Sequence, residues 1–430
     1  MSEWKEYKVS EFSQILSGTT PSSSIEEYWD GDIRWITPVD LSKTTSRFID
    51  NSERKITKKG LENSSRRMIP AYSVVMSSRA PIGYFAISTQ EYTTNQGCKS
   101  FVLKNGQDKD FHYFNFLLNK NKFLNLGSGS TFQEISKTSI HKLTFIFPTT
   151  FAEQRAIASV LTNIDEAIEA TEKIIAKRRL VKEGLMQDLF RYGLDDKGQL
   201  RSEKTHRFKD SFLGRIPEEW DVVEFGNRKY FTLVTDGSHY SPKPVENSEF
   251  LIATVENMRV RNFDLRTCKF ISKKDYQSLT LNNCKPENYD ILFSKDGTIG
   301  QVFVYMQDSV KLVLLSSICI IRPSQDKVNS HFVANFLKSF HLAKQLISLT
   351  SGSALKRVVL RDINKIKILK PSINEQNKIA AVLLAIDTTI EKDEAVLEKL
   401  KAQKRGLMED LLSGKVQVPS DMIAKYDKTN

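Results

Sequence analysis

The stretch that decides the fold occurs twice, as EGLMQDLF at 183–190 and as RGLMEDLL at 405–412. Each copy closes a longer segment that begins with Glu-Gln, and the two segments keep one register without a gap. Aliphatic residues recur within them at alternating steps of four and three, which is the a/d seam of a heptad. The seam residues are Ile157, Leu161, Ile164, Ile168, Ile175 and Leu185 in the first copy, and Ile379, Leu383, Ile386, Ile390, Leu397 and Leu407 in the second. The pattern predicts two matched long helices.

Each segment lacks proline for about 38 residues and would form a rod of roughly 57 Å. Because a lone rod would leave its apolar stripe in water, we expect the two copies to pack together as an antiparallel or crossed pair. Lys182 and Lys404 interrupt the seam at equivalent positions, and Gly184 and Gly406 precede each Leu-Met. Glycine inside a helix costs about 1 kcal/mol relative to alanine. These glycines therefore indicate close packing or a kink, or simply inheritance from one duplicated ancestor.

The sequence before each helix predicts a mixed α/β block. Runs of β-branched and aromatic residues bounded by turn residues predict strands at 100–104, 143–147, 291–293 and 313–321. A helical period predicts helices at 111–126 and 331–349. The two blocks match weakly at Trp4 and Trp220, and at Ser-Gly-Ser turns at 128–130 and 351–353. The chain therefore reads as block, helix, block, helix.

The composition favours a polyanionic partner, because 63 Lys and Arg against 52 Asp and Glu give a net charge of +11. No apolar run approaches the ~20 residues of a membrane span, and the first residues carry no apolar signal core. We therefore expect a soluble, cytoplasmic protein. The four cysteines lack CxxC spacing and the six histidines form no ligand pair, so we expect buried thiols rather than zinc ligands or disulfides.

Loops of small polar residues are the candidate binding surface. Each Ser-Gly-Ser turn lies between a predicted helix and a predicted strand, where its donors can meet phosphates or base edges. A plain turn is the alternative. The triplets Ser77-Ser78-Arg79 and Ser294-Lys295-Asp296 occupy corresponding sites after a strand. Arg79 and Lys295 can donate to guanine or phosphate, whereas Asp296 can accept from cytosine. The alternative for these three is an ordinary solvated turn.

This layout resembles the DNA specificity subunits of type I restriction-modification systems. The matching residues are Gly18-Thr19-Thr20-Pro21, Tyr28-Trp29, Gly31, Trp35-Ile36, Asp40, Thr94-Asn95-Gln96-Gly97, Leu213-Gly214-Arg215-Ile216-Pro217, Trp220 and the two Glu-Gln and Gly-Leu-Met signatures. The resemblance extends to about Val418. It implies an α+β fold in which two mixed α/β target recognition domains are separated by two long antiparallel coiled-coil helices, with a pseudo-two-fold internal repeat.

The resemblance also implies a division of the chain and a set of partners. The expected parts are a first recognition domain at 1–150, a central helix at 151–192, a linker at 193–212, a second recognition domain at 213–372, a distal helix at 373–417 and a tail at 418–430. Such a subunit is non-catalytic and reads an asymmetric, bipartite DNA target, with helix length fixing the unread gap. It docks two modification subunits, which carry S-adenosylmethionine, and possibly restriction subunits. No cofactor is expected in this chain.

The residues that we assign to DNA binding are Thr20, Ser22, Arg79, Lys99, Ser128, Ser130 and Gln133 in the first block, and Asp236, His239, Tyr240, Lys295, Asp296, Ser351, Ser353, Lys356 and Arg357 in the second. Two other classes of protein compete with this reading. A self-contained methyltransferase or nuclease is disfavoured, because the chain has no Asn-Pro-Pro-Tyr-like tetrapeptide and no complete phosphate-binding loop. A stand-alone DNA-binding scaffold or regulator would more often read a palindrome through identical chains.

Overall fold

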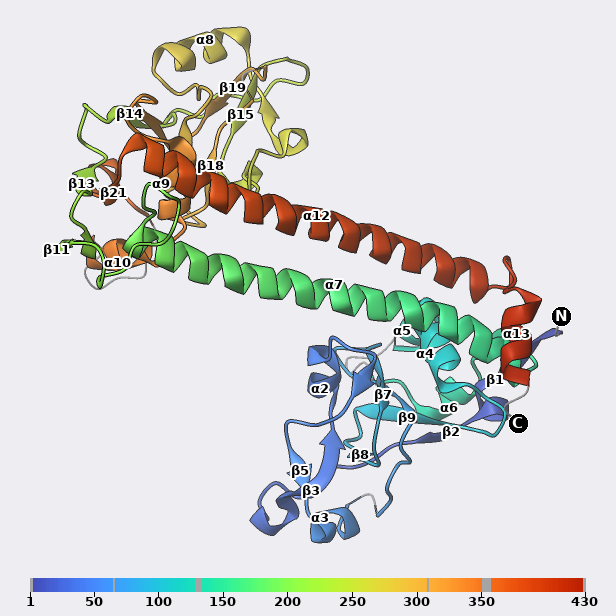
Figure 1. Ribbon diagram of the computed structural model, residues 1–430. Coiled ribbons are helices and arrows are strands. Elements are labelled where there is room, and N and C mark those ends of the chain that lie inside the picture. The colour runs from blue at the N-terminus through green and yellow to red at the C-terminus, as the bar shows by residue number, and fades with distance from the viewer. Residues whose placement is uncertain (1–2, 65, 128–133, 308, 350–356, 428–430) are drawn as a thin grey trace. The chain divides into compact units, whose positions relative to one another are not determined.

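The computed structural model describes residues 3–64, 66–127, 134–307, 309–349 and 357–427 (Figure 1). The chain divides into two compact units, residues 1–174 with 393–430 and residues 175–392. Each unit contains one mixed α/β domain together with parts of both long helices. The fold class expected from the sequence, two mixed α/β domains with two long helices, is confirmed.

The first domain, blue to cyan in Figure 1, is built on a five-stranded sheet of order β2-β9-β6-β7-β4. A three-stranded sheet, β5-β3-β8, and the pair β1-β10 accompany it. The strands are β1 Trp4–Lys8, β2 Ser13–Leu16, β3 Trp29–Ile36, β4 Phe48–Ile49, β5 Lys55–Ile56, β6 Val74–Ser77, β7 Phe85–Ser88, β8 Thr93–Thr94, β9 Cys98–Leu103 and β10 Thr144–Pro148. The helices are α1 Val9–Phe12, η1 Glu26–Tyr28, α2 Pro38–Lys43, α3 Lys58–Glu62, α4 Lys109–Leu118, α5 Lys120–Leu124, η2 Asn125–Gly127 and α6 Lys137–His141.

The second domain has a four-stranded sheet of order β14-β20-β17-β18, a three-stranded sheet β16-β15-β19, and the pairs β13-β21 and β11-β12. The strands are β11 Phe208–Ser211, β12 Gly214–Pro217, β13 Asp221–Glu224, β14 Phe231–Asp236, β15 Leu251–Ala253, β16 Lys269–Phe270, β17 Ile291–Ser294, β18 Val302–Val304, β19 Leu312–Leu314, β20 Ile318–Pro323 and β21 Lys367–Lys370. The helices are η3 Val255–Asn257, η4 Leu265–Thr267, α8 Lys273–Leu281, α9 Ser330–Leu337, α10 Phe340–Leu349 and α11 Leu360–Ile363.

The two domains share one topology. The strand order β2-β9-β6-β7 in the first domain corresponds to β14-β20-β17-β18 in the second. In the smaller sheets, β3 pairs with β8 and β15 pairs with β19, and both pairings are parallel. The first domain adds β4 at the edge of its main sheet, and the second adds the β11-β12 hairpin. The internal repeat that is plain in the helices therefore extends to domains whose sequences barely match.

Two long helices follow the domains, α7 at Phe151–Tyr192 and α12 at Ile373–Leu411. Within each unit their segments run antiparallel, since Asp165 and Glu172 contact Lys404 and Lys401 in the first unit. The distal helix ends before the expected residue 417, because the chain turns at Gly414, which has a φ of 74°. A further helix, α13 at Ser420–Asp427, lies in the segment expected to be a tail.

The repeated Glu-Gln signature ties each domain to the start of its helix. Trp4 donates its indole N–H to Glu153 at 3.1 Å, and Trp220 donates to Glu375 at 3.0 Å. The glutamines that follow act in the same way in both units. Gln154 donates to the carbonyl of Pro148 and accepts from the backbone of Asp108, while Gln376 donates to Pro371 and accepts from Asn329. The weak match between Trp4 and Trp220 thus reflects a shared hydrogen bond.

Gly184 and Gly406, the glycines before each Leu-Met, do not mark close packing. A Cβ built on Gly184 or on Gly406 meets no atom within 4 Å. Close packing was one of the alternatives left open for these glycines, and it does not occur among the described residues, because both glycines lie on exposed helix surface. Two predicted helices, 111–126 and 331–349, are each divided into two shorter α-helices. Another difference from expectation lies in the sheets. The run 313–321 is not one strand but parts of β19 and β20, separated by a turn at 315–317.

Within the described residues, no helix is long and apolar enough to cross a membrane.

Candidate nucleic-acid interface

The first domain gathers several predicted binding residues around the ammonium group of Lys99. Lys99 lies on β9 and is only 5% exposed. Its Nζ is 2.8 Å from the carbonyl oxygen of Gln96, 3.2 Å from Oγ of Ser78 and 3.4 Å from Oγ of Ser17. One buried charge therefore joins the loop after β2, the loop after β6 and the turn before β9.

Arg79 extends this network to the surface. Its Nε donates to Oε2 of Glu134 at 2.9 Å, and its Nη2 lies 2.8 Å from the same oxygen. The other carboxylate oxygen of Glu134 is 3.4 Å from Nζ of Lys99. Burial lowers the pKa of Lys99, and the nearby carboxylate of Glu134 opposes that effect. Because the Arg79 side chain is 48% exposed, the result is a chain of charges that runs from inside the domain to a half-exposed guanidinium.

The second domain has a similar network around Lys295, which is 1% exposed. Its Nζ lies 3.2 Å from Oδ2 of Asp236 and 3.9 Å from Oδ2 of Asp296. The imidazole of His239 lies 3.5 Å from the same Asp236 oxygen. Arg357 approaches Asp296 at 3.3 Å and is 50% exposed. The structure thus brings five predicted residues of this domain together.

Three other predicted residues lie on exposed loops. Thr20 donates its hydroxyl to the side-chain oxygen of Gln96 at 2.7 Å, so it borders the Lys99 network. Ser22 shares a hydrogen bond with Ser24. Tyr240 is 60% exposed and its backbone N–H donates to the hydroxyl of Ser238. The remaining predicted residues, Ser128, Ser130, Gln133, Ser351, Ser353 and Lys356, lie outside the described residues.

The loops after β6 and β17 have one architecture despite different sequences. Ser77 donates its hydroxyl to the carbonyl of Pro81 at 2.7 Å, and Ser294 donates to Thr298 at 2.6 Å. Each hydroxyl also accepts from a backbone N–H seven residues along the chain. A glycine with positive φ completes each loop, Gly83 at 82° and Gly300 at 94°, where a side chain would be strained. Arg79 and Lys295 are therefore presented from equivalent scaffolds.

Sequence reasoning missed four residues of the first network, namely Ser17, Ser78, Gln96 and Glu134. Serine and glutamine in loops are too common to single out. Glu134 was detectable, because it follows the first Ser-Gly-Ser turn at the spacing by which Arg357 follows the second. When one repeat has an acidic residue and the other repeat has an arginine at the equivalent position, the two repeats have exchanged charges there.

The predicted seam residues form the interface between the long helices. All twelve are buried or half-buried. In the first unit Ile157 and Leu161 share a core with Leu411, and in the second unit Ile379 and Leu383 share a core with Leu189 and others. The polar seam residues are paired rather than solvated. Nζ of Lys182 lies 2.5 Å from Oδ1 of Asp387, and Lys404 forms the equivalent ion pair with Asp165.

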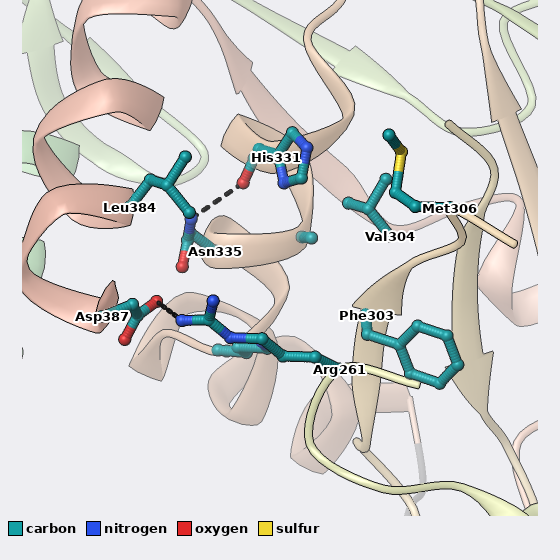
Figure 2. Close-up of a pocket in the computed structure, with 10 residues that line it drawn as sticks. Arg261, Phe303, Val304, Met306, His331, Asn335, Leu384 and Asp387 are labelled. Atoms are coloured by element: carbon teal, nitrogen blue, oxygen red, sulfur yellow. Dashed lines mark hydrogen bonds and ion pairs between the residues drawn. The ribbon is translucent and has the colours of Figure 1, made fainter. Parts of the chain in front are cut away.

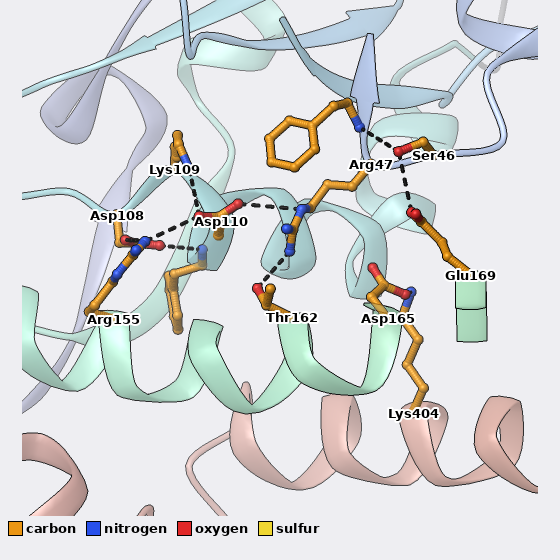
Figure 3. Close-up of polar contacts among 12 residues, drawn as sticks. Ser46, Arg47, Asp108, Lys109, Asp110, Arg155, Thr162, Asp165, Glu169 and Lys404 are labelled. Carbon is orange, nitrogen blue, oxygen red and sulfur yellow. Dashed lines mark hydrogen bonds and ion pairs between the residues drawn. The ribbon is translucent and has the colours of Figure 1, made fainter. Parts of the chain in front are cut away.

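An arginine joins the first domain to its helix (Figure 3). The guanidinium of Arg47 donates to the hydroxyl of Thr162 at 2.6 Å and lies 3.5 Å from the carboxylate of Asp110. The same carboxylate is 3.2 Å from Arg155 on α7. Beside it, Ser46 donates to Glu169 at 3.2 Å. Arg47 and Asp110 are both buried, so this polar joint fixes the loop that follows α2 against the helix.

The second domain has a corresponding but more open joint (Figure 2). Arg261 lies 3.6 Å from Asp387. It also lies 2.5 Å from Glu391. Asp387 and Glu391 are the repeat equivalents of Asp165 and Glu169. A cavity of about 230 Å³ adjoins this pair, and its lining includes His331 from α9. Burial, with Arg261 and Lys338 nearby, lowers the pKa of His331. An arginine therefore attaches each domain to the same face of its own helix.

Nothing in the described part of the chain resembles a metal centre, because no group of three or more His, Cys, Asp or Glu side chains there could hold an ion. Cys98, Cys268, Cys284 and Cys319 are free and buried, as expected. Burial raises the pKa of each thiol, for Cys268 to about 11. The cysteines are therefore core residues.

The sequence and the fold match one class of protein. The family model for the type I restriction modification DNA specificity domain matches residues 1–177 and 246–402, which is most of the chain. The chain therefore belongs to this family, and the resemblance inferred from its motifs is confirmed. It is a specificity subunit, and DNA sequence recognition is the role that defines the family.

Individual relatives agree over nearly the whole length. The MjaIX specificity subunit of a type I restriction enzyme from Methanocaldococcus jannaschii is 27% identical over 426 residues, 97% of this chain and 94% of that protein. The MjaVIII specificity subunit from the same organism is 22% identical over 426 residues, covering 97% and 93% of the two proteins.

Solved structures support the same fold. The S subunit of a type I restriction-modification system from M. genitalium superposes with a TM-score of 0.57 at 15% identity, covering 95% of this chain and 96% of that one. A chain from a study of complex assembly and conformational transition in a type I system gives 0.54 at 12% identity, covering 95% and 97%. At these identities the likeness concerns fold alone.

Proposed function

We propose that this chain is the non-catalytic DNA-reading subunit of a type I restriction-modification complex, and that it binds an asymmetric, bipartite target. One domain would read each half of the target. The observation that carries the proposal is the pair of equivalent loop networks with unlike residues. Arg79 occupies the site of Asp296, and Glu134 occupies the site of Arg357.

Unlike donors and acceptors at equivalent positions support unlike half-sites. A guanidinium suits the O6 and N7 acceptors of guanine, whereas a carboxylate suits the amino group of cytosine. The half-exposed arginines beside β6 and β17 stand where a base edge or a phosphate could meet them. The net charge of +11 adds an attraction for the DNA backbone that does not depend on sequence.

The long helices would also bind protein partners. Each helix exposes apolar side chains outside its seam, where a partner subunit could bury them. The exposed residues are Ile174, Leu180 and Val181 on α7, and Val382, Leu384 and Val396 on α12. Ile174 and Val396 are repeat equivalents. We propose that these surfaces dock two modification subunits, which would carry S-adenosylmethionine, and that restriction subunits join this assembly.

The helices would further serve as a ruler. We propose that the 42 residues of α7 and the 39 of α12 set the number of unread base pairs between the half-sites. Half-site spacing is in general a consequence of protein geometry. A protein that reads chromosomal DNA in this way would work in the cytoplasm.

The test is co-expression of the chain with a candidate modification subunit, followed by long-read mapping of modified bases. The expected result is methylated adenine confined to one asymmetric sequence with an internal gap. Cells that express the modification subunit alone should lack this pattern. Methylation restricted to a palindrome, or methylation that does not depend on this chain, would contradict the proposal. Sequence-specific binding without any modification would favour the stand-alone regulator instead.

A further inference from the structure

The strand registers show which residues of the two networks are equivalent. Opposed residues at the ends of the central strands are Ser77 and Cys98 in the first domain, and Ser294 and Ile318 in the second. The next residue of each strand therefore corresponds as well. Lys99 has Cys319 as its equivalent, and Ser78 has Lys295. The buried lysines of the two domains consequently come from different strands.

Although their strands differ, the two ammonium groups reach the same neighbour. Leu16 lies opposite Ser100, so Ser17 follows at the level of Lys99. Asp236 lies opposite Cys319 and is therefore the equivalent of Ser17. Nζ of Lys99 lies 3.4 Å from Ser17, and Nζ of Lys295 lies 3.2 Å from Asp236. Each domain thus places a buried positive charge between the same two loops.

The outer part of each network is exchanged too. An isolated β-bridge joins Arg79 to Glu134 in the first domain and Asp296 to Arg357 in the second. The arginine and the carboxylate have exchanged positions within the bridge. In both domains the carboxylate nevertheless lies between the arginine and the buried lysine. Inheritance from one ancestor explains equal residues at equal positions. It does not explain an interaction that persists while its residues change places.

We propose that Lys99 and Lys295 are positioning residues for DNA reading, each holding a carboxylate that aims a half-exposed arginine at one half of the target. This inference rests on the proposed function. At 5% and 1% exposure neither lysine is open to a phosphate group. Lys99 instead fixes three loops at once, and Glu134 fixes the fork of Arg79.

The physical reason for a buried lysine at this place is orientation. An arginine that reads a base must hold its planar fork in one direction, and a carboxylate bound side-on provides that direction. A carboxylate with a single cation partner would follow the mobile arginine. A second, immobile cation behind the carboxylate keeps it in place. Burying such a charge is costly, and Lys99 shows that cost as a pKa lowered by burial.

The experiment uses the full chain in complex with its modification subunits and the target mapped as above. Affinity is measured for the cognate duplex, for a duplex altered in either half-site, and as a function of salt. The test variants are Lys99→Met and Lys295→Met, which keep a long side chain without its charge. The controls are Lys104→Met and Lys327→Met. Lys104 is exposed and directly follows β9, and Lys327 is half-buried, with a side chain 41% exposed, four residues after β20.

Lys99→Met should reduce discrimination at the first half-site at least about tenfold, the equivalent of about 1.4 kcal/mol, and leave the second half-site unchanged. Lys295→Met should do the reverse. The dependence of affinity on salt should not change, because no phosphate contact is lost. The untouched half-site reports in each case that the chain is folded.

The contrary results are distinct from one another. A fall of the salt slope by about 0.9 with discrimination retained would make the lysine a phosphate contact and overturn the inference. Loss of discrimination at both half-sites would make its role general stability, and would also overturn it. A native chain that shows no target preference would instead remove the proposed function itself.

A transplant provides a second test. Lys99→Cys combined with Ser78→Lys gives the first domain the arrangement of the second. This double variant should recover discrimination that Lys99→Cys alone loses. If the single and double variants lost the same amount of discrimination, the inference would be contradicted. It holds that the position of the ammonium group matters, whichever strand supplies the lysine.

Discussion

Lys182 of α7 and Asp387 of α12 form an ion pair within the helix seam, with 2.5 Å between Nζ and Oδ1. The pair has a counterpart in Lys404 and Asp165, where the lysine comes from the second copy and the aspartate from the first. Since Lys182 corresponds to Lys404 and Asp165 to Asp387, each copy donates one lysine and one aspartate. Seam charges matched in this way oppose a parallel or shifted pairing, which would bury them without partners.

Exchange of the charges at Asp165 and Lys404 tests this pairing. We expect Asp165→Lys and Lys404→Asp each to lower the free energy of unfolding by about 1–2 kcal/mol, because each leaves two like charges in a partly buried seam. The double variant should recover most of that loss, as measured by urea denaturation. The same exchange at the more exposed pair Glu172 and Lys401 should change stability by less than about 1 kcal/mol. A double variant no more stable than the worse single one would contradict the assignment.

Replacement of Gly184 and Gly406 should stabilise the chain. A Cβ at Gly184 or Gly406 meets no atom within 4 Å, so alanine adds helix propensity without a clash. We expect Gly184→Ala and Gly406→Ala each to raise the free energy of unfolding by up to about 1 kcal/mol. Thermal unfolding of the isolated chain is the measurement. A matched substitution at Gly193, where φ is 67° and a Cβ would meet Glu375 and Trp220, should destabilise instead. Unchanged or reduced stability at both helix positions would be the opposing result.

Loss of the Arg79 side chain should relax the reading of one base pair. We expect Arg79→Ala to reduce discrimination at a single position of the first half-site by about 1–3 kcal/mol, because the variant would lose the bidentate contact to guanine that we propose for Arg79. Arg357→Ala should act on the second half-site only. Competition binding with duplexes that carry single substitutions measures both effects. If Arg79 bound phosphate, affinity would instead fall for all sequences and the salt slope would fall by about one.

Acid should weaken the first domain through His112. Burial lowers the pKa of this imidazole to about 3, and the ring stacks on Phe12 with 4.7 Å between centroids. The unfolded value is about 6.5, so below that pH the unfolded chain binds a proton that the folded chain does not. Stability should therefore fall by up to about 1.4 kcal/mol per pH unit from this group as the pH drops from about 6.5 towards 3.

The variant His112→Phe keeps an aromatic ring and removes the titration. Its unfolding free energy, measured in urea between pH 7 and about pH 4, should depend less steeply on pH than that of the native chain. Equal slopes would show that His112 is not responsible.

The long helices were predictable because one physical requirement, burial of an apolar stripe, repeats along the chain with a fixed period. The seam residues of both helices, such as Ile157 in α7 and Leu407 in α12, follow that period directly. The sheets were harder, since the turn at 315–317 contains Leu315 and two serines rather than glycine or proline, and the run therefore reads as one strand. The predicted helix at 111–126 likewise breaks at Asn119, which ends α4 and begins α5.

The candidate interface was only partly predictable, for a different reason. Arg79, Lys295 and Asp296 follow strands and have the right chemistry, so local sequence indicates them. The place of Lys99 depends on Ser17 and Ser78, which are far away in the chain and come together only through the sheet. Charges exchanged between repeats, as at Glu134 and Arg357, cannot be recognised by matching like residues. They are found by aligning equivalent positions, either from the spacing after the two Ser-Gly-Ser motifs or from the strand registers.

The reciprocal pairing of the seam has a consequence for shorter chains. A polypeptide with one domain and one helix would carry both an aspartate equivalent to Asp165 and a lysine equivalent to Lys182, so its surface would be self-complementary. Two identical copies would then pair through the same surface on each copy, and their recognition domains would be alike. Such a homodimer would read a palindrome. In this chain the two recognition domains differ in sequence, which is what the proposed asymmetric target requires.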